Sequence, residues 1–119
     1  MAVKKVTKTD IPVKVNLDTT VLLTVTIGNA QIGGNVVRWK SNPNILAKGE
    51  IKNLNLGLGV DIRGKILKVT TNVLDVNEVT NGIVIVHYFH NGNPSSFTYE
   101  DRVEKDGDIL QLVTEYTFK

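Results

Sequence analysis

Residues 53–65 alternate aliphatic side chains with small or polar ones, and this pattern constrains the fold more than any other stretch. Every second residue from Leu54 to Ile62 is aliphatic. Only an extended strand places such residues on one face, because side chains along a strand point alternately to its two sides. The stretch therefore predicts a β-strand with one apolar face. Its opposite face carries Asn55, Gly57, Gly59 and Asp61.

The same period of two dominates the rest of the chain, and no stretch shows a convincing helical period. Short alternating segments are separated by turns rich in Gly, Asn and Asp, which is typical of antiparallel sandwiches and barrels. We therefore predict an all-β, single-domain antiparallel β-sandwich of seven to eight strands, with a closed antiparallel β-barrel as the alternative. The predicted β domain spans residues 11–119, and residues 1–10 are expected to form a flexible basic arm.

Three pairs of alternating segments predict hairpins, because pairing them across a short turn gathers their apolar residues on one side. The pairs are residues 11–17 with 21–27, residues 54–62 with 66–74, and residues 97–104 with the segment that follows Asp106-Gly107. Pro12 cannot donate a hydrogen bond to a neighbouring strand, so the strand over 11–17 is expected at a sheet edge. Residues 83–89 are apolar on both faces and predict a central strand, followed by a turn at 91–94.

Composition excludes several classes of protein. The chain contains no cysteine, which rules out disulfides and thiolate metal sites. Its net charge of +2 is too small to indicate nucleic acid as a partner. No segment is long enough to span a bilayer, so we expect a soluble protein, either cytoplasmic or exported with its leader absent. The lysines near the start could contact anions, but a solubilising segment is the favoured interpretation: Lys4, Lys5, Lys8 and Lys14.

The two histidines do not indicate a shared metal site. His87 and His90 are three residues apart, so in a strand they face opposite sides. No serine lies in a nucleophile elbow or near a histidine in the sequence. The glycines at 28, 33 and 34 precede no helix that could bind a phosphate. An enzyme is therefore the less favoured class, and we predict no catalytic residues and no cofactor.

Acidic and amide side chains cluster in two predicted loops that are expected at the same end of the domain. Oxygen-rich loops at the end of a sandwich could bind calcium, which takes about six to eight oxygen ligands. Ordinary turn chemistry is the favoured interpretation, because the spacing matches no defined calcium loop. The weak calcium candidates are Asp75, Asn77, Glu78, Asp106 and Asp108.

Two further groups of residues suggest contact surfaces. The aromatic residues Phe97, Tyr99, Tyr116 and Phe118 share the apolar side of their predicted hairpin, so we expect them in the core and not on a stacking platform. Glycines two residues apart on a strand leave a shallow trough that a ligand or another backbone could enter. Alternatively, the glycines permit a strong local twist or a bulge of the strand. In the predicted register, this candidate binding surface consists of Gly57, Gly59, Lys68 and Thr70.

These observations lead to a functional hypothesis without a named partner. We expect a non-catalytic module that binds a protein partner or self-associates through strand edges and surfaces, above all through the strand over 11–17 and the glycine trough. The alternatives are a barrel that binds a small apolar or carbohydrate ligand and a calcium-dependent binding module. The inward positions are mostly Leu, Val and Ile, which favours a packed core over a cavity.

Overall fold

Nine strands and one helical turn follow one another along residues 2–119, which are the residues that the computed structural model describes. The chain thus has one or two more strands than the seven to eight expected. The elements are β1 (Val3–Val13), β2 (Thr20–Ile27), β3 (Ile32–Trp39), β4 (Ala47–Gly49), β5 (Leu54–Leu58), α1 (Gly59–Ile62), β6 (Ile66–Leu74), β7 (Gly82–Asn91), β8 (Asn93–Arg102) and β9 (Ile109–Phe118).

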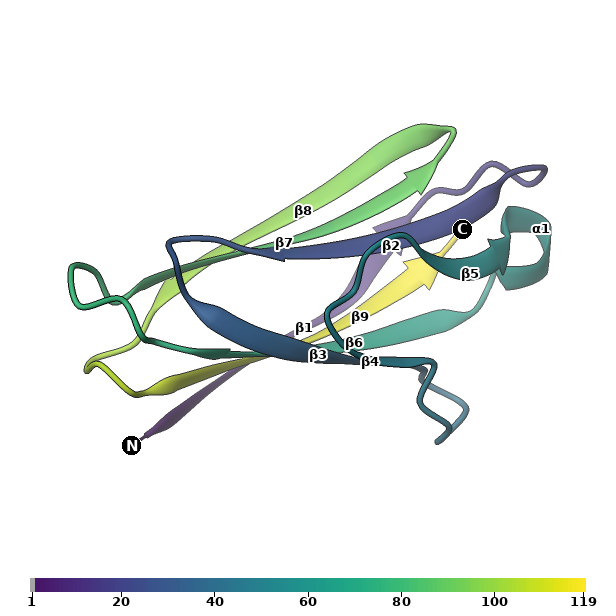
Figure 1. The fold of residues 1–119 in the computed structure, drawn as a ribbon. Helices are drawn as coiled ribbons and strands as arrows, with labels where there is room; N and C mark the ends of the chain where they lie inside the picture. Colours follow the sequence, from purple (N-terminus) through teal and green to yellow (C-terminus); the bar gives the residue numbers. More distant parts are fainter. Residues whose placement is uncertain (1) are drawn as a thin grey trace.

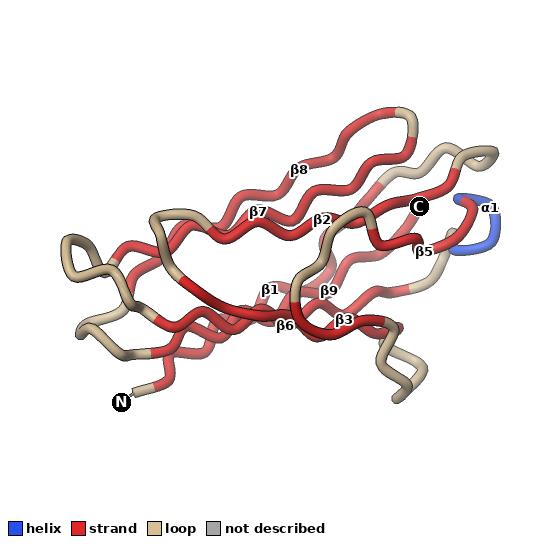
Figure 2. The backbone as a smooth tube through the Cα atoms, in the orientation of Figure 1, coloured by secondary structure: helices blue, strands red, loops and turns tan. Residues whose placement is uncertain are grey.

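The strands form two sheets that pack face to face as a sandwich (Figure 1). One sheet has the order β1-β9-β6-β3-β4, and the other has the order β5-β2-β7-β8. Neighbouring strands are antiparallel except for β1, which runs parallel to β9. The tube in Figure 2 shows the two layers joined by loops at their ends. Within residues 2–119 the sheets do not close into a barrel, so the prediction of an all-β sandwich is confirmed and the barrel alternative is not.

The core lies between the two sheets and is built by alternate residues of each strand. In β6, for example, Leu67, Val69 and Val73 are fully buried while their neighbours along the strand are partly exposed. The bulkiest buried side chains are Tyr116, Phe89 and Phe118. Because the period-two pattern of the sequence matches the burial pattern, the hydrophobic effect selects which face of each strand turns inward.

All three predicted hairpins are wrong, because the paired segments belong to different sheets. Residues 11–13 end β1, which pairs with β9, whereas β2 pairs with β5 and β7. Likewise β5 lies beside β2, whereas β6 pairs with β3 and β9. The strand β8 pairs with β7, and the connection that follows it crosses to the opposite sheet, where β9 begins. Alternation identifies the buried face of a strand, but it does not identify the strand's partner.

The expected basic arm is part of the sheet, because Val3–Lys8 pair with β9 in a regular parallel register. The predicted boundary at residue 10 therefore falls inside β1. Other expectations are confirmed: Pro12 lies on an edge strand, β7 lies between two strands, and the chain turns at Gly92 between β7 and β8. No helix among residues 2–119 is long and apolar enough to cross a membrane.

Candidate interaction surface at the sheet edges

Two sheets leave four edge strands in the described part of the chain, namely β1, β4, β5 and β8. An edge strand exposes unpaired backbone N–H and C=O groups, which another strand can pair with. Folded proteins usually block such edges with lysine, proline, bulges, charged residues or short strands. The four edges of this sandwich differ sharply in how they are blocked.

The edge at β1 is heavily protected. It carries Lys4, Lys5 and Lys8, all exposed, and it contains Pro12. Its register shifts between Lys8 and Ile11, where Asp10 adopts a positive φ of 58°. A bulge of this kind twists the strand away from any flat partner. The sequence correctly predicts β1 as an edge, but its chemistry opposes strand addition.

The edges at β4 and β5 are protected in other ways. The strand β4 has only three residues, too few for a stable ladder. The strand β5 has five residues, its register shifts opposite Val21 and Leu22, and Gly57 has a positive φ of 113°. The chain then turns at once into α1. Neither strand offers a long flat edge.

The edge at β8 lacks most of these protections. It has ten residues paired with β7 without a register shift, and it contains no lysine. Its proline, Pro94, lies at the second position, so the segment from Ser95 to Tyr99 carries neither a charge nor a proline. Side chains alternate between exposed and half-buried along the strand. The strand β8 is therefore the one long edge strand with an unbroken register among residues 2–119.

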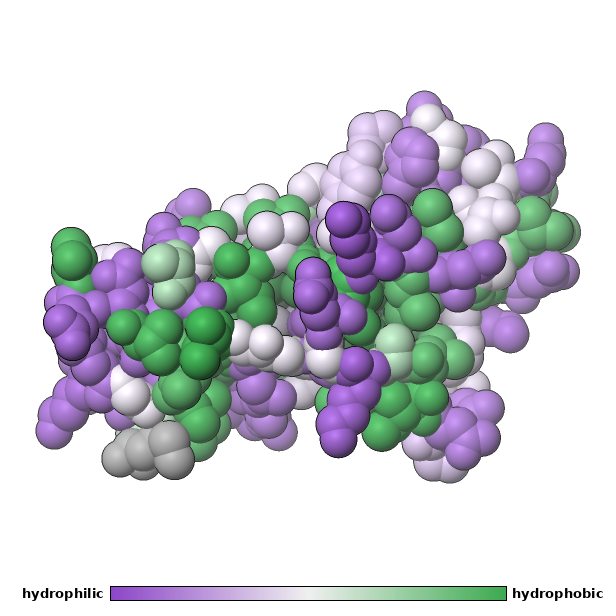
Figure 3. All heavy atoms as spheres, in the orientation of Figure 1, coloured by the Kyte–Doolittle hydropathy of each residue, from purple (hydrophilic) through white to green (hydrophobic). Residues whose placement is uncertain are grey.

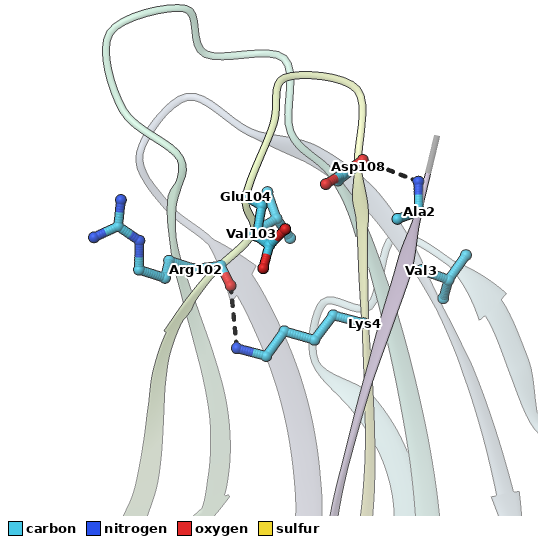
Figure 4. Close-up of a pocket in the computed structure, with 7 residues that line it drawn as sticks. All are labelled: Ala2, Val3, Lys4, Arg102, Val103, Glu104 and Asp108. Carbon is cyan, nitrogen blue, oxygen red and sulfur yellow. Dashed lines mark hydrogen bonds between the residues drawn. The ribbon is translucent and has the colours of Figure 1, made fainter.

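A groove separates the edges of β1 and β8, which belong to opposite sheets. One pocket on this side has a volume of about 770 Å³ and lies between the start of β1 and the loop that follows β8. Figure 4 shows Lys4 reaching across this space toward the end of β8. The Lys4 ammonium lies 2.6 Å from a carboxylate oxygen of Asp101 and 3.2 Å from the carbonyl oxygen of Arg102. The hydrogen bond from Lys4 lowers the pKa of Asp101.

A second pocket is lined by Tyr99 of β8 together with Val6 and Lys8 of β1. The hydroxyl of Tyr99 begins a hydrogen-bonded chain of side chains through the core. The oxygen atoms of Tyr99 and Tyr116 are 2.9 Å apart, and the oxygen of Tyr116 lies 2.6 Å from Nδ1 of His87. On the other side of the ring, Nε2 lies 3.0 Å from the hydroxyl of Thr71. These side chains come from β8, β9, β7 and β6, so the chain links both sheets.

The donor and the acceptor of each of these hydrogen bonds can be assigned from the end of the network at Asn35 on β3. The amide nitrogen of Asn35 donates to the carbonyl of Gly49, so its Oδ1 accepts the proton of Thr71 at 2.7 Å. Thr71 has one proton and therefore accepts from Nε2 of His87. A neutral ring then leaves Nδ1 as the acceptor for the Tyr116 hydroxyl. Each group therefore donates to the next one along the network, which runs from Tyr99 on β8 to Asn35 on β3.

Burial shifts the pKa values of the histidine and the two tyrosines in this hydrogen-bonded network. It lowers the pKa of His87 from 6.5 to about 4, so the ring is neutral at pH 7. Burial also raises the pKa of Tyr116 and the pKa of Tyr99, so both phenols stay protonated. His87 is fully buried and His90 is exposed, which confirms that they face opposite sides. A neutral, fully hydrogen-bonded and enclosed imidazole is suited to holding the two sheets in one arrangement.

The aromatic strip is part of the core, as expected. Tyr116 and Phe118 are fully buried, and Phe97 and Tyr99 pack against them from β8. Phe97 lies 5.2 Å from the Tyr116 ring, centroid to centroid, and Phe89 lies 4.8 Å from it. No stacking platform for sugars or bases is formed by these rings.

The two acidic loops meet at one end of the sandwich, as predicted. The N–H of Asp75 donates to the carbonyl of Asp108 at 3.0 Å. However, three of the four carboxylate oxygens of these residues bind protein donors: one oxygen of Asp75 accepts from Gln31, and both oxygens of Asp108 accept backbone N–H groups. The N–H groups of Ala2 and Lys105 lower the pKa of Asp108.

The remaining calcium candidates do not complete a site. Asn77 binds the N–H of Val79 through its side-chain oxygen, while Glu78 and Asp106 are exposed. Among residues 2–119, no three carboxylates or histidines converge in a way that could hold a metal. The hydrogen bonds at Asn77 and Asp108 include local ones of the kind that stabilises turns.

The predicted glycine trough does not form, because its two halves lie in different sheets. Gly57 and Gly59 belong to β5 and α1, whereas Lys68 and Thr70 lie on β6. A Cβ atom on Gly59 would lie 1.9 Å from the carbonyl oxygen of Asn16. The close backbone approach foreseen for these glycines is therefore internal, and it holds the β1–β2 connection against α1.

A second kind of surface, an open cleft, lies on the opposite side of the sandwich. It has a volume of about 510 Å³ and lies between β2 and β3 beside the connection from β4 to β5. Ile27, Ile32 and Ile51 supply apolar lining, and Gln31 and Asn35 supply amides that are already hydrogen-bonded within the protein. Figure 3 shows apolar and polar side chains interspersed on this face. The lining contains no aromatic ring, which makes the cleft poorly suited to a sugar.

The sequence predicted a strand over 97–104, but not that it lies at an open edge, because that segment was paired with β9. The signal was nonetheless present, since Ser95–Tyr99 is an uncharged segment after a proline and ends in three β-forming residues. Comparison with protein families, with curated proteins and with solved structures finds no match for this chain. Its function must therefore be inferred from its own geometry.

Proposed function

We propose that this chain is a non-catalytic association module that binds through the open edge of β8. The observation that carries the proposal is the contrast among the edges: β1, β4 and β5 are blocked, whereas β8 presents the uncharged segment Ser95–Tyr99 within ten residues that pair with β7 in regular register. Strand addition derives its affinity from main-chain hydrogen bonds and its specificity from alternate side chains. An edge left open beside three blocked ones is the expected signature of such a surface.

The chemistry of the interior supports a binding role over a catalytic one. The buried polar groups His87, Thr71 and Tyr116 are hydrogen-bonded to one another and enclosed in the core. A general acid or base needs access to a substrate at hydrogen-bonding distance. We therefore propose that the hydrogen-bonded network of these side chains stabilises the fold and that the edge of β8 binds the partner.

Light scattering over a wide range of protein concentration tests the proposal. We expect concentration-dependent association of the wild-type chain, and we expect Thr98→Lys to weaken it, since an edge lysine opposes strand pairing. Thr98 is exposed at the middle of β8, so the substitution leaves the core unchanged. Thr26→Lys is the matched control, because Thr26 is an exposed threonine on β2 of the same sheet. Equal association of both variants, or a strictly monomeric wild type, contradicts the proposal.

The cleft between β2 and β3 supports a second candidate function, the binding of a small apolar ligand. Three isoleucines line it, and Ile32 is 56% exposed. Native mass spectrometry of the protein from its source tests this candidate. A retained small molecule supports it, and Ile32→Glu should then abolish the retention. A bare protein mass contradicts it.

A further inference from the structure

The open edge of β8 matches one occupant particularly well, namely the same edge of a second copy. We propose that two chains pair β8 with β8 in antiparallel orientation about a two-fold axis at Thr98, and this inference rests on the proposed function above. The two four-stranded sheets then form one continuous eight-stranded sheet. Figure 1 shows β8 at the outer edge of its sheet, with β7 on one side only.

Pairing about Thr98 places complementary side chains opposite one another. On the inner face, Phe97 of each copy lies opposite Tyr99 of the other, which gives two aromatic cross-strand pairs. Both rings are half-buried in the single chain and already pack against the core. A second strand beside them would cover the exposed part of each ring. This adds apolar burial to the main-chain hydrogen bonds.

The charges on β8 also fit this register. Glu100 lies opposite Ser96, Asp101 lies opposite Ser95, and Arg102 lies opposite Pro94. No like charges face one another, which matters because directly opposed like charges destabilise a strand pair. Asp101 is in addition neutralised within its own chain by Lys4, at 2.6 Å.

Neighbouring registers are less favourable on the same grounds. An axis at Glu100 places two carboxylates opposite each other. An axis at Tyr99 replaces the two Phe97–Tyr99 pairs with a single pair of Tyr99 rings and places Asp101 opposite Phe97. An axis at Phe97 likewise leaves a single aromatic pair, formed by the two Phe97 rings, and it places Tyr99 opposite Ser95. The choice of Thr98 therefore rests on the order of side chains along the strand.

The interface is small, since each chain contributes a single strand. Interfaces below about 1,200 Å² are typical of weak or transient complexes. We therefore expect a dimer that forms as the concentration rises and dissociates on dilution.

Single cysteines test the axis directly, because the natural chain contains no cysteine. In the proposed dimer, the two Thr98 Cα atoms lie about 5 Å apart, within reach of a disulfide. Thr98→Cys should therefore form a covalent dimer rapidly under mild oxidation. Ser96→Cys should not cross-link to itself, because the two Ser96 positions are about 13 Å apart along the paired strands. An equal mixture of Ser96→Cys and Glu100→Cys should yield the heterodimer.

Thr26→Cys serves as the control for random collision, since Thr26 is exposed on β2. If light scattering shows association that Thr98→Lys weakens, but Thr98→Cys cross-links no faster than Thr26→Cys, the two-fold axis is wrong while the β8 edge stands. If Ser96→Cys cross-links to itself most rapidly, the axis is likewise wrong. If the wild type stays monomeric at every concentration and Thr98→Cys does not cross-link, both proposals fail.

Discussion

The Nδ1 atom of His87 lies 2.6 Å from the hydroxyl oxygen of Tyr116 inside the core, and it accepts the proton of that hydroxyl. Protonation of the ring would place two donors face to face and bury a positive charge. The other titratable groups of the hydrogen-bonded chain are the phenols of Tyr116 and Tyr99, and burial raises the pKa of both. Neither phenol can supply a compensating negative charge near neutral pH.

We therefore predict that acid destabilises the fold through His87. Its pKa is about 4 in the folded chain and 6.5 in the unfolded chain, so the unfolded state binds more protons between these values. The free energy of unfolding should fall as the pH decreases from 6.5 toward 4, by up to about 3 kcal/mol from this group, and it should gain nothing above that window.

Urea unfolding at several pH values measures this dependence. His87→Gln should remove this contribution to the pH dependence, because the amide can keep a donor and an acceptor but does not titrate. His90→Gln, which changes the exposed histidine, should retain the wild-type profile. A profile that is unchanged by His87→Gln and altered by His90→Gln would refute the prediction.

The backbone approach at Gly59 leads to a second prediction. An added Cβ atom would lie 1.9 Å from the carbonyl oxygen of Asn16 and 3.1 Å from the Cα of Leu17, so the backbone itself would have to move. Gly59→Ala should lower the free energy of unfolding by about 3 kcal/mol. Gly34→Ala is the control, because the nearest atom to its Cβ would be 3.8 Å away. Thermal unfolding of the two variants compares them, and equal melting temperatures would contradict the structure.

Gln31 joins two loops, and this role gives a third prediction. Its Nε2 donates to Asp75 at 2.7 Å, and its Oε1 accepts the N–H groups of Val76 and Asn77 at 2.8 and 3.0 Å. The second carboxylate oxygen of Asp75 is buried without a hydrogen-bond partner, so Gln31 is the side chain that satisfies this carboxyl.

Gln31→Ala should therefore cost about 2 to 3 kcal/mol of stability, because buried polar groups lose their partner. Gln31→Glu should cost more at neutral pH, since it places a second carboxylate against Asp75. Gln111→Ala is the matched control: Gln111 donates one side-chain bond, to Asn72 at 3.0 Å, and is partly exposed. Chemical denaturation ranks the three variants, and a larger loss in the control would show that the loop contact matters little.

Calcium gives a fourth prediction, because three of the four carboxylate oxygens of Asp75 and Asp108 already accept hydrogen bonds from the protein. Asp108 accepts the N–H groups of Ala2 and Lys105, and Asp75 accepts from Gln31. We expect millimolar calcium to leave the melting temperature unchanged, within the small shift that magnesium produces as an ionic-strength control. A rise of several degrees that is specific to calcium and abolished by Asp108→Asn would establish the calcium site instead.

Part of the candidate site, like part of the fold, can be predicted from the local sequence pattern, and the rest cannot. Pro12 marked β1 as an edge correctly, because a missing N–H is a local property of one residue. The open edge at β8 was hidden, because it depends on whether Phe97 and its neighbours pair with β9 or with β7. Both pairings bury the same faces of the strands, so the alternation of side chains cannot distinguish them.

Contacts between distant parts of the chain decide those pairings. Asn16 and Asn91, which hold the crossing from β1 to β2, are separated by 75 positions, and Asn16 donates to the Asn91 carbonyl at 2.8 Å. The crossing from β8 to β9 is held by Gly107, whose N–H donates to the carbonyl of Asp75 at 2.9 Å. Neither contact can be predicted from a local sequence pattern.

The sequence by itself thus determined the all-β class, the inward face of most strands and the burial of Tyr116 and Phe118. Those properties follow from the two-residue period of a strand and from the hydrophobic effect, which act residue by residue. Only the tertiary structure decided which strands pair, that Gly59 meets Asn16, and that β8 is left open at an edge. Those properties depend on hydrogen bonds and close packing between residues far apart in the chain, where many pairings satisfy the same local pattern.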